Sequence, residues 1–258
     1  MSRGTALITG ASSGIGAELA KLCAAGGYDV VLVARRAALL EKLAADLVSR
    51  HGIDARIVTA DLSQEAAPEE IVRAMDGRPI DVLINNAGFG VYGPFTQTAW
   101  EDERRLLQVN LMATVRLTKL ILPRMVERGA GRILNVASTA AFVPGPLMAM
   151  YYASKAFVVS FSLAVSNEVK GTGVTLTVLC PGPTHTGFVE AAGLTESRLF
   201  QGPAMSAEQV AREGYDAMLA GRAEVIAGAR NRWMILGTRL APRSLLAALA
   251  RRLNSSVQ

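Results

Sequence analysis

The sequence predicts an α/β fold of the doubly wound (Rossmann) type, a mostly parallel sheet with helices on both faces. Short apolar runs such as Val30-Val31-Leu32-Val33 do not alternate with polar residues, as expected for strands that are buried on both faces. Longer segments of helical periodicity separate these runs, which indicates parallel strands joined by helices. No Ser/Gly-rich linker, charge block or repeat divides the chain. We therefore expect a single domain with a C-terminal helical extension.

Each expected element follows from its local composition. Runs rich in β-branched residues predict strands at 5–9, 29–34, 55–58, 82–84, 132–136, 174–179 and 224–227. Segments with helical periodicity predict helices near 15–25, 37–50, 69–75, 100–127, 152–169 and 207–219. The single domain would span 1–258, with a core at about 5–228 and a basic amphipathic extension at about 229–258.

The composition is that of a folded protein with an uneven charge. Half of the 258 residues are hydrophobic and 19% are charged, which excludes a disordered chain. Of the net charge of +5, residues 225–258 contribute six arginines and no acidic residue, so the rest is almost neutral. Cys23 and Cys180 suggest neither a disulfide framework nor a metal site. With no signal segment and no apolar run of about 20 residues, we expect a cytoplasmic protein without a metal.

A glycine-rich turn follows the first expected strand. The segment from Thr9 to Gly16 has the spacing G-x-x-x-G-x-G and opens the first helix. Glycines let backbone N–H groups approach a diphosphate at a helix N-terminus, where the helix dipole favours an anion. The candidate cofactor-binding residues of this turn are Gly10, Ser12, Ser13, Gly14, Ile15 and Gly16. The alternative is a tight turn that binds nothing.

The end of the second expected strand indicates which nicotinamide cofactor would bind. An NAD site usually presents an acidic residue about 20 residues beyond the glycine-rich turn. Here Ala34 stands in that place and is followed by Arg35 and Arg36, which suit the 2′-phosphate of NADP(H), with a hydroxyl from Ser12 or Ser13. The alternative is that both arginines are solvated residues at the start of the next helix.

Two further strand ends carry candidate cofactor contacts. After the third strand, the Asp61 carboxylate beside Leu62 is placed to accept from an adenine amino group, or else to cap a helix. After the fourth strand come Asn85, Asn86, Ala87 and Gly88, of which the last three are candidate cofactor contacts. For Asn85, a structural role at the strand end is as good an interpretation as a contact.

The sharpest pattern combines Ser138, Tyr151 and Lys155. Tyr151 and Lys155 are four residues apart and share one helix face, while Ser138 follows the fifth strand. A lysine ammonium about 4 Å away would favour the phenolate by roughly 4 kcal/mol, or about three pK units, before desolvation opposes it. That shift would bring the phenol into the range of efficient proton transfer. The alternative is a solvated helix face, and Tyr152 is the neighbouring decoy.

With these motifs in place, the chain resembles a short-chain dehydrogenase/reductase from about Thr5 to Leu219. The resemblance also rests on Asn110 and on Pro181-Gly182 with Thr186. It implies an NADP(H)-dependent oxidoreductase that transfers a hydride between the nicotinamide and a carbonyl or secondary alcohol, with Tyr151 as acid/base. It further implies that Lys155 holds the nicotinamide ribose and lowers the Tyr151 pKa, and that Ser138 orients the substrate. By the same resemblance Asn110 holds a water, and Pro181, Gly182 and Thr186 contact the carboxamide.

Other functions on this fold remain as alternatives. One is a non-catalytic NADP(H)-binding sensor or scaffold, and another is an epimerase or dehydratase. The intact Ser138, Tyr151 and Lys155 argue against the first, because binding alone needs no acid/base group. The resemblance implies a homodimer or homotetramer, paired through the helix that carries Tyr151.

Apolar loops favour a lipophilic substrate. The residues expected near the nicotinamide are Phe89, Val91, Tyr92, Phe95, Phe142, Val143, Leu147 to Met150, Phe188 and Leu194. Such a lining favours a hydrophobic carbonyl or alcohol, although the same residues would also suit a subunit interface. Neither His51 nor His185 is assigned to the chemistry.

The extension predicts two helices on either side of Pro242. Leu246, Leu249 and Leu253 fall on one helical face, away from Arg251 and Arg252. We expect this extension to pack on the body of the protein or on another subunit. Peripheral contact with an anionic membrane is the alternative. Nucleic-acid binding is not expected, because no recognition motif is present.

Overall fold

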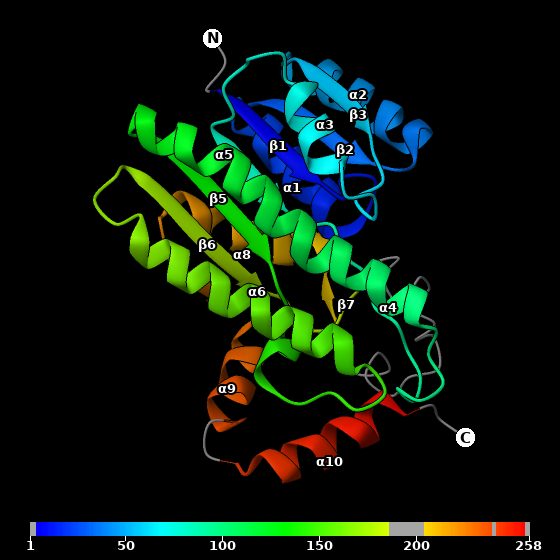
Figure 1. Ribbon diagram of the computed structural model, residues 1–258. Coiled ribbons are helices and arrows are strands. Elements are labelled where there is room, and N and C mark those ends of the chain that lie inside the picture. The colour runs from blue at the N-terminus through cyan, green and yellow to red at the C-terminus, as the bar shows by residue number, and fades with distance from the viewer. Residues whose placement is uncertain (1–3, 186–203, 239–240, 256–258) are drawn as a thin grey trace.

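The computed structural model describes residues 4–185, 204–238 and 241–255. Its main sheet has seven parallel strands in the order β3-β2-β1-β4-β5-β6-β9 (Figure 1). They are β1 (Thr5–Thr9), β2 (Asp29–Ala34), β3 (Ala55–Thr59), β4 (Val82–Asn85), β5 (Gly131–Val136), β6 (Val174–Cys180) and β9 (Glu224–Ile226). This arrangement confirms the predicted fold class. The strand order reverses between β1 and β4, which opens a crevice at the carboxyl ends of the strands.

Helices cover both faces of the sheet. They are α1 (Gly14–Ala25), α2 (Ala37–His51), α3 (Ala67–Arg73), α4 (Trp100–Leu107), α5 (Thr114–Arg128), α6 (Ala149–Glu168), α8 (Ala207–Leu219), α9 (Ala229–Thr238) and α10 (Arg243–Asn254). Short strands β7 (Thr184–His185) and β8 (Met205–Ser206) form a separate pair. Figure 1 shows α5 and α6 in front of the sheet and α1 and α8 behind it.

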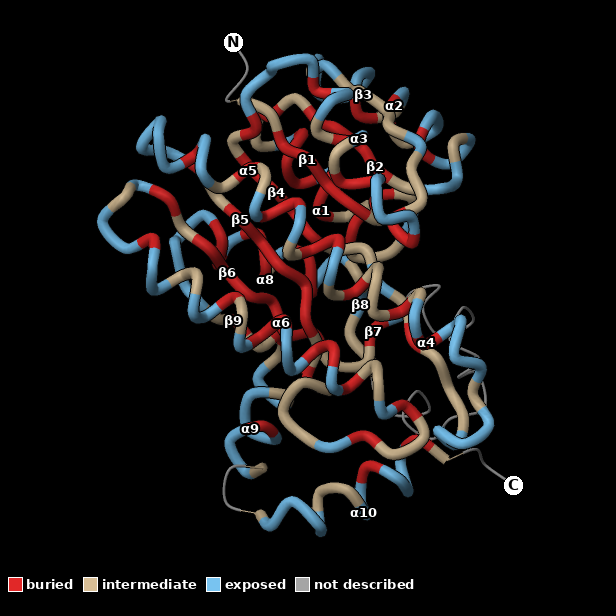
Figure 2. Tube along the Cα trace, viewed as in Figure 1, coloured by how far each residue is buried: buried red, intermediate tan, exposed pale blue. Residues whose placement is uncertain are grey.

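The hydrophobic core consists of two layers separated by the sheet. Ala6 and Ile8 of β1 pack with α1, α2 and α8, while Leu7 packs with α3 and α5 on the other face. Successive side chains point to opposite faces, so a strand covered on both sides must be apolar at every position. Figure 2 shows that the buried residues follow the strands through the centre of the molecule.

The expected helix at 100–127 is interrupted by a π-helical segment. This segment, Gln108–Ala113, separates α4 from α5 and contains Asn110, whose side chain is buried. A π-helical segment is a common way to place a functional side chain. Of the other expected helices, the third begins at Ala67 rather than Glu69, and α6 begins at Ala149 rather than Tyr152.

The C-terminal extension forms the two predicted helices, α9 and α10, with Pro242 directly before α10. Figure 1 places both below the carboxyl ends of β5 and β6. Among the residues that the structure describes, no helix is long and apolar enough to cross a membrane.

Candidate active site

A cavity of about 930 Å³ lies along the carboxyl ends of the strands. The candidate residues that line it are Gly10, Ser12, Ser13, Gly14, Ile15, Arg35, Arg36, Asp61, Leu62, Asn86, Ala87, Gly88, Ser138, Tyr151, Lys155, Pro181 and Gly182. Gly16 and Asn110 do not line the cavity and support it from behind. Thr186 lies outside the described residues.

The glycine-rich turn is packed closely against the end of β4. Gly10 and Gly14 have φ angles of +67° and +57°, which favour glycine. A Cβ on Gly16 would collide with the Gly10 carbonyl and the Asn86 amide, so only glycine fits at this position. The Asn86 amide donates to the Thr9 carbonyl at 2.9 Å and braces the turn from the other side of the crevice.

Arg36 connects the second strand to this turn. Its guanidinium donates to Oγ of Ser12 at 2.9 Å and to Oγ of Ser13 at 2.8 Å. Arg35 lies beside it at the edge of the same cavity, and both arginines are exposed. The two cations and two hydroxyls form a group that suits a phosphate.

Asp61 is held in a turn and does not cap a helix. Its Oδ1 accepts from the Ser63 backbone N–H at 3.0 Å, and α3 begins only at Ala67. Partial burial works to raise the Asp61 pKa, but hydrogen bonds from Ser63 and the charges of Arg35 and Arg105 outweigh it. The pKa therefore lies below its usual range. Arg105 of α4 also lines the cavity, although no pattern in the sequence indicated it.

Asn85 is structural. Its buried amide donates to Asn135 Oδ1 at 2.9 Å and to Thr118 Oγ1 at 3.2 Å, so it ties β4 to β5 and α5. Of the two interpretations that the sequence left open, the structure therefore supports the strand-end role.

Ser138, Tyr151 and Lys155 converge at the centre of the cavity. Ser138 accepts from the Ala140 backbone N–H at 3.1 Å and is hydrogen-bonded to Tyr151. Lys155 is only 5% exposed, and its Nζ donates to the Val136 carbonyl at 3.0 Å. The same Nζ lies 5.8 Å from the centre of the Tyr151 ring.

The expected lowering of the Tyr151 pKa is wrong for this arrangement. Burial raises the Tyr151 pKa above its ordinary value, although the Ser138 hydrogen bond works to lower it. Burial also lowers the pKa of Lys155 to about 8. The expected lowering requires a charged lysine about 4 Å from the phenol. In the structure Lys155 binds a backbone carbonyl, and desolvation dominates for both groups.

Asn110 is held by protein groups next to this site. Its amide accepts from the Phe89 N–H at 3.1 Å, donates to the Phe89 carbonyl at 3.0 Å and donates to Ser154 Oγ at 3.1 Å. A Cβ on Gly88 would come within 3.1 Å of Asn110 Oδ1 and 3.3 Å of Lys155 Nζ, so these groups are close. Asn110 therefore joins the end of β4 to the residue that precedes Lys155.

The predicted apolar lining is correct only in part. Phe89, Val143 and Met148 line the cavity. Phe142 instead packs against the core beside α6, and Phe95 is 62% exposed. The others that do not line the cavity are Val91, Tyr92, Leu147, Ala149 and Met150. Phe188 and Leu194 lie outside the described residues.

The C-terminal helices supply much of the remaining lining. Their contributions are Arg230, Asn231, Met234, Ile235, Thr238, Leu246, Leu249, Ala250 and Leu253. The extension thus packs on the body of its own chain. The apolar face at Leu246, Leu249 and Leu253 was visible in the sequence, but nothing in the sequence indicated that it turns back over the cavity.

Comparison with known proteins agrees with this geometry. Residues 4–197 match the family described as short chain dehydrogenase. The very-long-chain 3-oxoacyl-CoA reductase of Pyrenophora tritici-repentis is 40% identical over 179 residues, 67% of this chain and 52% of the relative. The ketoacyl reductase HetN of Nostoc sp. is 34% identical over 204 residues, 78% of this chain and 69% of that protein. The chain spans about half the length of the fungal relative.

Solved structures share the fold over most of the chain. A short-chain dehydrogenase from Sphingobium yanoikuyae in complex with NADPH has a TM-score of 0.81 and 34% identity, covering 92% of this chain and 94% of that one. A 7β-hydroxysteroid dehydrogenase has a TM-score of 0.88 and 26% identity, with 96% of each chain covered. The bulky-bulky ketone specific alcohol dehydrogenase from Comamonas testosteroni has a TM-score of 0.78 and 30% identity, with 93% of each covered.

Proposed function

The chain belongs to the short-chain dehydrogenase family of oxidoreductases, which act at C=O and CH–OH groups, and we propose that it uses NADP(H) to reduce a lipophilic carbonyl with Tyr151 as the acid. The observation that carries this proposal is the half-buried Tyr151, hydrogen-bonded to Ser138 and next to Lys155, in one cavity with Arg36 and its serine partners. A cavity with a cation pair at one end and an acid/base group at its centre suits a phosphorylated cofactor and a reacting carbonyl.

The residues present fit NADP(H). The turn before α1 has glycine at positions 10, 14 and 16. Without side chains there, its backbone leaves room for a diphosphate at the start of α1. Arg35 and Arg36 would hold the 2′-phosphate, and Asp61 the adenine. The cofactor supplies the hydride, whereas the protein orients it and handles the proton.

The protonated form of Tyr151 suits carbonyl reduction. With its pKa above the ordinary value, the phenol is protonated at neutral pH and is the proton donor that a developing alkoxide needs. Ser138 is placed to hydrogen-bond the same oxygen. Lys155, with its pKa lowered to about 8, is suited to return a proton to Tyr151.

The apolar part of the cavity lining suits a long apolar substrate. Phe89, Val143 and Met148 line the cavity together with Met234 and Ile235 of α9. Two of the named relatives are 3-oxoacyl-CoA or ketoacyl reductases. We therefore take a 3-oxo group on a long acyl chain as the first substrate to test. A sensor or scaffold would need no buried acid/base group, and an epimerase or dehydratase would show no net NADPH oxidation.

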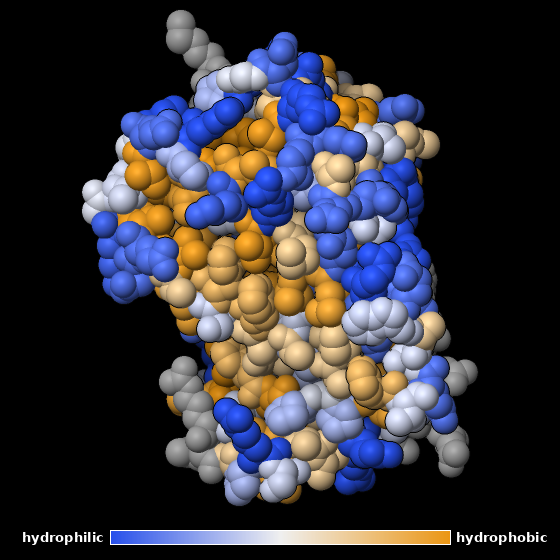
Figure 3. All heavy atoms as spheres, viewed as in Figure 1, coloured by the Kyte–Doolittle hydropathy of each residue, from blue (hydrophilic) through white to orange (hydrophobic). Residues whose placement is uncertain are grey.

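Pairing of two copies through α6 belongs to the same proposal. Phe157 and Leu163 of α6 are exposed, and Phe157 stacks on Phe161 with ring centres 6.0 Å apart. Figure 3 shows apolar side chains gathered over α5 and α6 on the face in view. Burying this face between two copies would form a homodimer, which a further contact could extend to a tetramer.

The deciding experiment is a substrate panel followed by NADPH absorbance. It includes 3-oxoacyl thioesters of increasing chain length, bulky ketones and polar hydroxy acids. We expect turnover on hydrophobic carbonyls and a loss of about 10²-fold to 10⁴-fold in Tyr151→Phe, with unchanged NADPH binding. Near-wild-type turnover by Tyr151→Phe would overturn the mechanism. Activity restricted to polar hydroxy acids would overturn the substrate class.

A further inference from the structure

The outward sides of α9 and α10 carry large apolar side chains that are exposed to solvent. On α9, Trp233 is 73% exposed and Leu236 is 51% exposed. On α10, Leu245 is 60% exposed and Leu249 is 53% exposed. Leu245 and Leu249 are four residues apart and share one side of the helix. We call Trp233, Met234, Leu236, Leu245, Leu249 and Leu253 the C-terminal apolar face.

Part of the C-terminal apolar face lies at the opening of the cavity. Met234, Leu249 and Leu253 are exposed to solvent and also line the cavity, so they lie where it opens. Their helices are held in place by buried contacts: Ile235 is 2% exposed, Ala250 is 6% exposed, and Asn254 is fully buried. The face is therefore a fixed part of the fold at the substrate end.

The C-terminal extension that carries this face contributes charge of a single sign. From residue 225 to 258 the chain has six arginines and no acidic residue. Arg232 forms an ion pair with Glu213 of α8. Within the part of the chain that the structure describes, Arg230, Arg243, Arg251 and Arg252 form no ion pair, and Arg243, Arg251 and Arg252 flank the exposed leucines of α10.

We propose that the C-terminal apolar face docks on an anionic lipid bilayer and opens the substrate end of the cavity toward the membrane. Apolar side chains framed by arginines, with a tryptophan among them, fit the boundary between lipid headgroups and acyl chains. A second copy fits less well, because it would bring the same uncompensated arginines into the interface. Entry of a lipophilic substrate from the bilayer rests on the proposed function, whereas the docking does not.

Trp233 provides a direct probe of docking. The chain has two tryptophans, Trp100 and Trp233, so Trp100→Phe leaves Trp233 as the reporter. With vesicles of phosphatidylcholine and phosphatidylglycerol, we expect a blue shift of its emission and quenching by brominated acyl chains. With vesicles of phosphatidylcholine alone, we expect little change, because the arginines then lack their counter-charge. Equal binding to both vesicle types, or to neither, would overturn the proposal.

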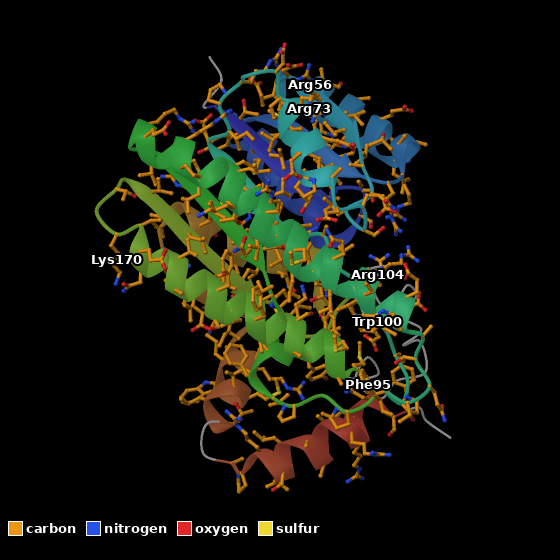
Figure 4. The ribbon with its side chains drawn as sticks, viewed as in Figure 1. Arg56, Arg73, Phe95, Trp100, Arg104 and Lys170 are labelled. Atoms are coloured by element: carbon orange, nitrogen blue, oxygen red, sulfur yellow. The ribbon has the colours of Figure 1, made fainter. Side chains whose placement is uncertain are left out.

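Matched variants separate the charge of this face from total charge. Arg251→Gln with Arg252→Gln should lower co-sedimentation with anionic vesicles at least tenfold. Arg73→Gln with Lys170→Gln removes the same charge elsewhere and should leave it unchanged; both residues are exposed and lie away from α9 and α10 in Figure 4. An equal loss of co-sedimentation in the two double variants would overturn the proposal. NADPH binding measured on each variant verifies that it is folded.

A third variant tests whether the apolar side chains contribute to vesicle binding, and whether a second copy of the chain covers the face instead. Trp233→Ser with Leu236→Ser should abolish vesicle binding and leave the molar mass in solution unchanged. If this variant instead lowers the molar mass, the face joins two copies and the membrane proposal is wrong. Because vesicle binding is measured without turnover, its failure is distinct from failure of the proposed reaction.

Discussion

The hydroxyl of Tyr152 donates a hydrogen bond to Oδ1 of Asn254 at 3.0 Å, joining the helix that carries Tyr151 to α10. The Asn254 amide also donates to the Pro146 carbonyl at 2.9 Å, and the asparagine is fully buried. The residue next to the proposed acid thus holds α10 over the cavity. Tyr152, which looked like a decoy in the sequence, has a structural role of its own.

Removal of the Asn254 side chain should loosen this closure. Asn254→Ala leaves the Tyr152 hydroxyl and the Pro146 carbonyl without their partner, and the free energy of unfolding should fall by about 1–3 kcal/mol. We expect a higher KM for a hydrophobic substrate and an unchanged Kd for NADPH, because the cofactor end is distant from α10. Urea unfolding and steady-state kinetics measure both.

The neighbouring Ser255 provides the control for Asn254→Ala. Its exposed hydroxyl donates to the Arg252 carbonyl, so Ser255→Ala should change stability by less than about 0.5 kcal/mol. Equal effects of the two substitutions would show that the Tyr152–Asn254 contact does not position α10.

Cofactor preference should depend on Arg35 and Arg36. Reversing either charge with aspartate should lower the NADPH/NADH ratio of kcat/KM by about tenfold or more, because a charge-assisted hydrogen bond contributes about 1.5–3 kcal/mol. Lys42→Asp changes an exposed residue of α2, the helix that follows these arginines, and should leave the ratio unchanged. An unchanged ratio in both Arg35→Asp and Arg36→Asp would refute the assignment of NADP(H).

Lys155 should make stability depend on pH in a narrow window. Its ordinary pKa of 10.5 falls to about 8 in the folded protein because of burial. Between these values the unfolded chain binds the proton more tightly, so stability rises with pH, by about 1.4 kcal/mol per unit. Lys155→Met removes this titration, so between pH 8 and 9 its free energy of unfolding should fall relative to that of wild type.

The buried thiols limit that window from above. Burial raises the pKa of Cys23 to about 12 and raises that of Cys180 as well. Above the ordinary thiol pKa of 9.0, the unfolded chain loses these protons before the folded chain does. The free energy of unfolding of wild type and of Lys155→Met should therefore both fall. Urea unfolding at pH 7, 8, 9 and 10 tests both signs. Parallel curves for wild type and Lys155→Met between pH 8 and 9 would contradict the assignment.

Subunit pairing should depend on Phe157. Phe157→Arg places a charge on the exposed face of α6 and should shift the molar mass by light scattering from the dimer or tetramer toward the monomer. Phe95→Arg changes an aromatic residue that is 62% exposed on a loop and should have no such effect. A wild-type monomer, or an unchanged mass in Phe157→Arg, would disprove pairing through α6.

Patterns confined to a few consecutive residues could be predicted from the sequence. The strands 5–9 and 29–34 have the expected bounds, because an apolar β-branched run is a local signal. The crevice residues could be predicted for a related reason: parallel strands bring their carboxyl ends to one edge of the sheet. Ser138 was therefore expected at that edge of the sheet, while Tyr151 lies on the helix that follows it, α6.

What depends on distant contacts could not be predicted. Three contacts join segments that are far apart in the chain. They are the hydrogen bond from Asn85 to Asn135, the charge interaction of Arg105 with Asp61, and the hydrogen bond that holds α10 over the cavity. The pKa values of Tyr151 and Lys155 belong to the same class, because desolvation depends on everything packed around a group. By itself the sequence determined the fold, the cofactor-binding edge and the proposed catalytic residues. Only the tertiary structure decided the protonation of that site and what encloses it, because burial is a property of the packed chain.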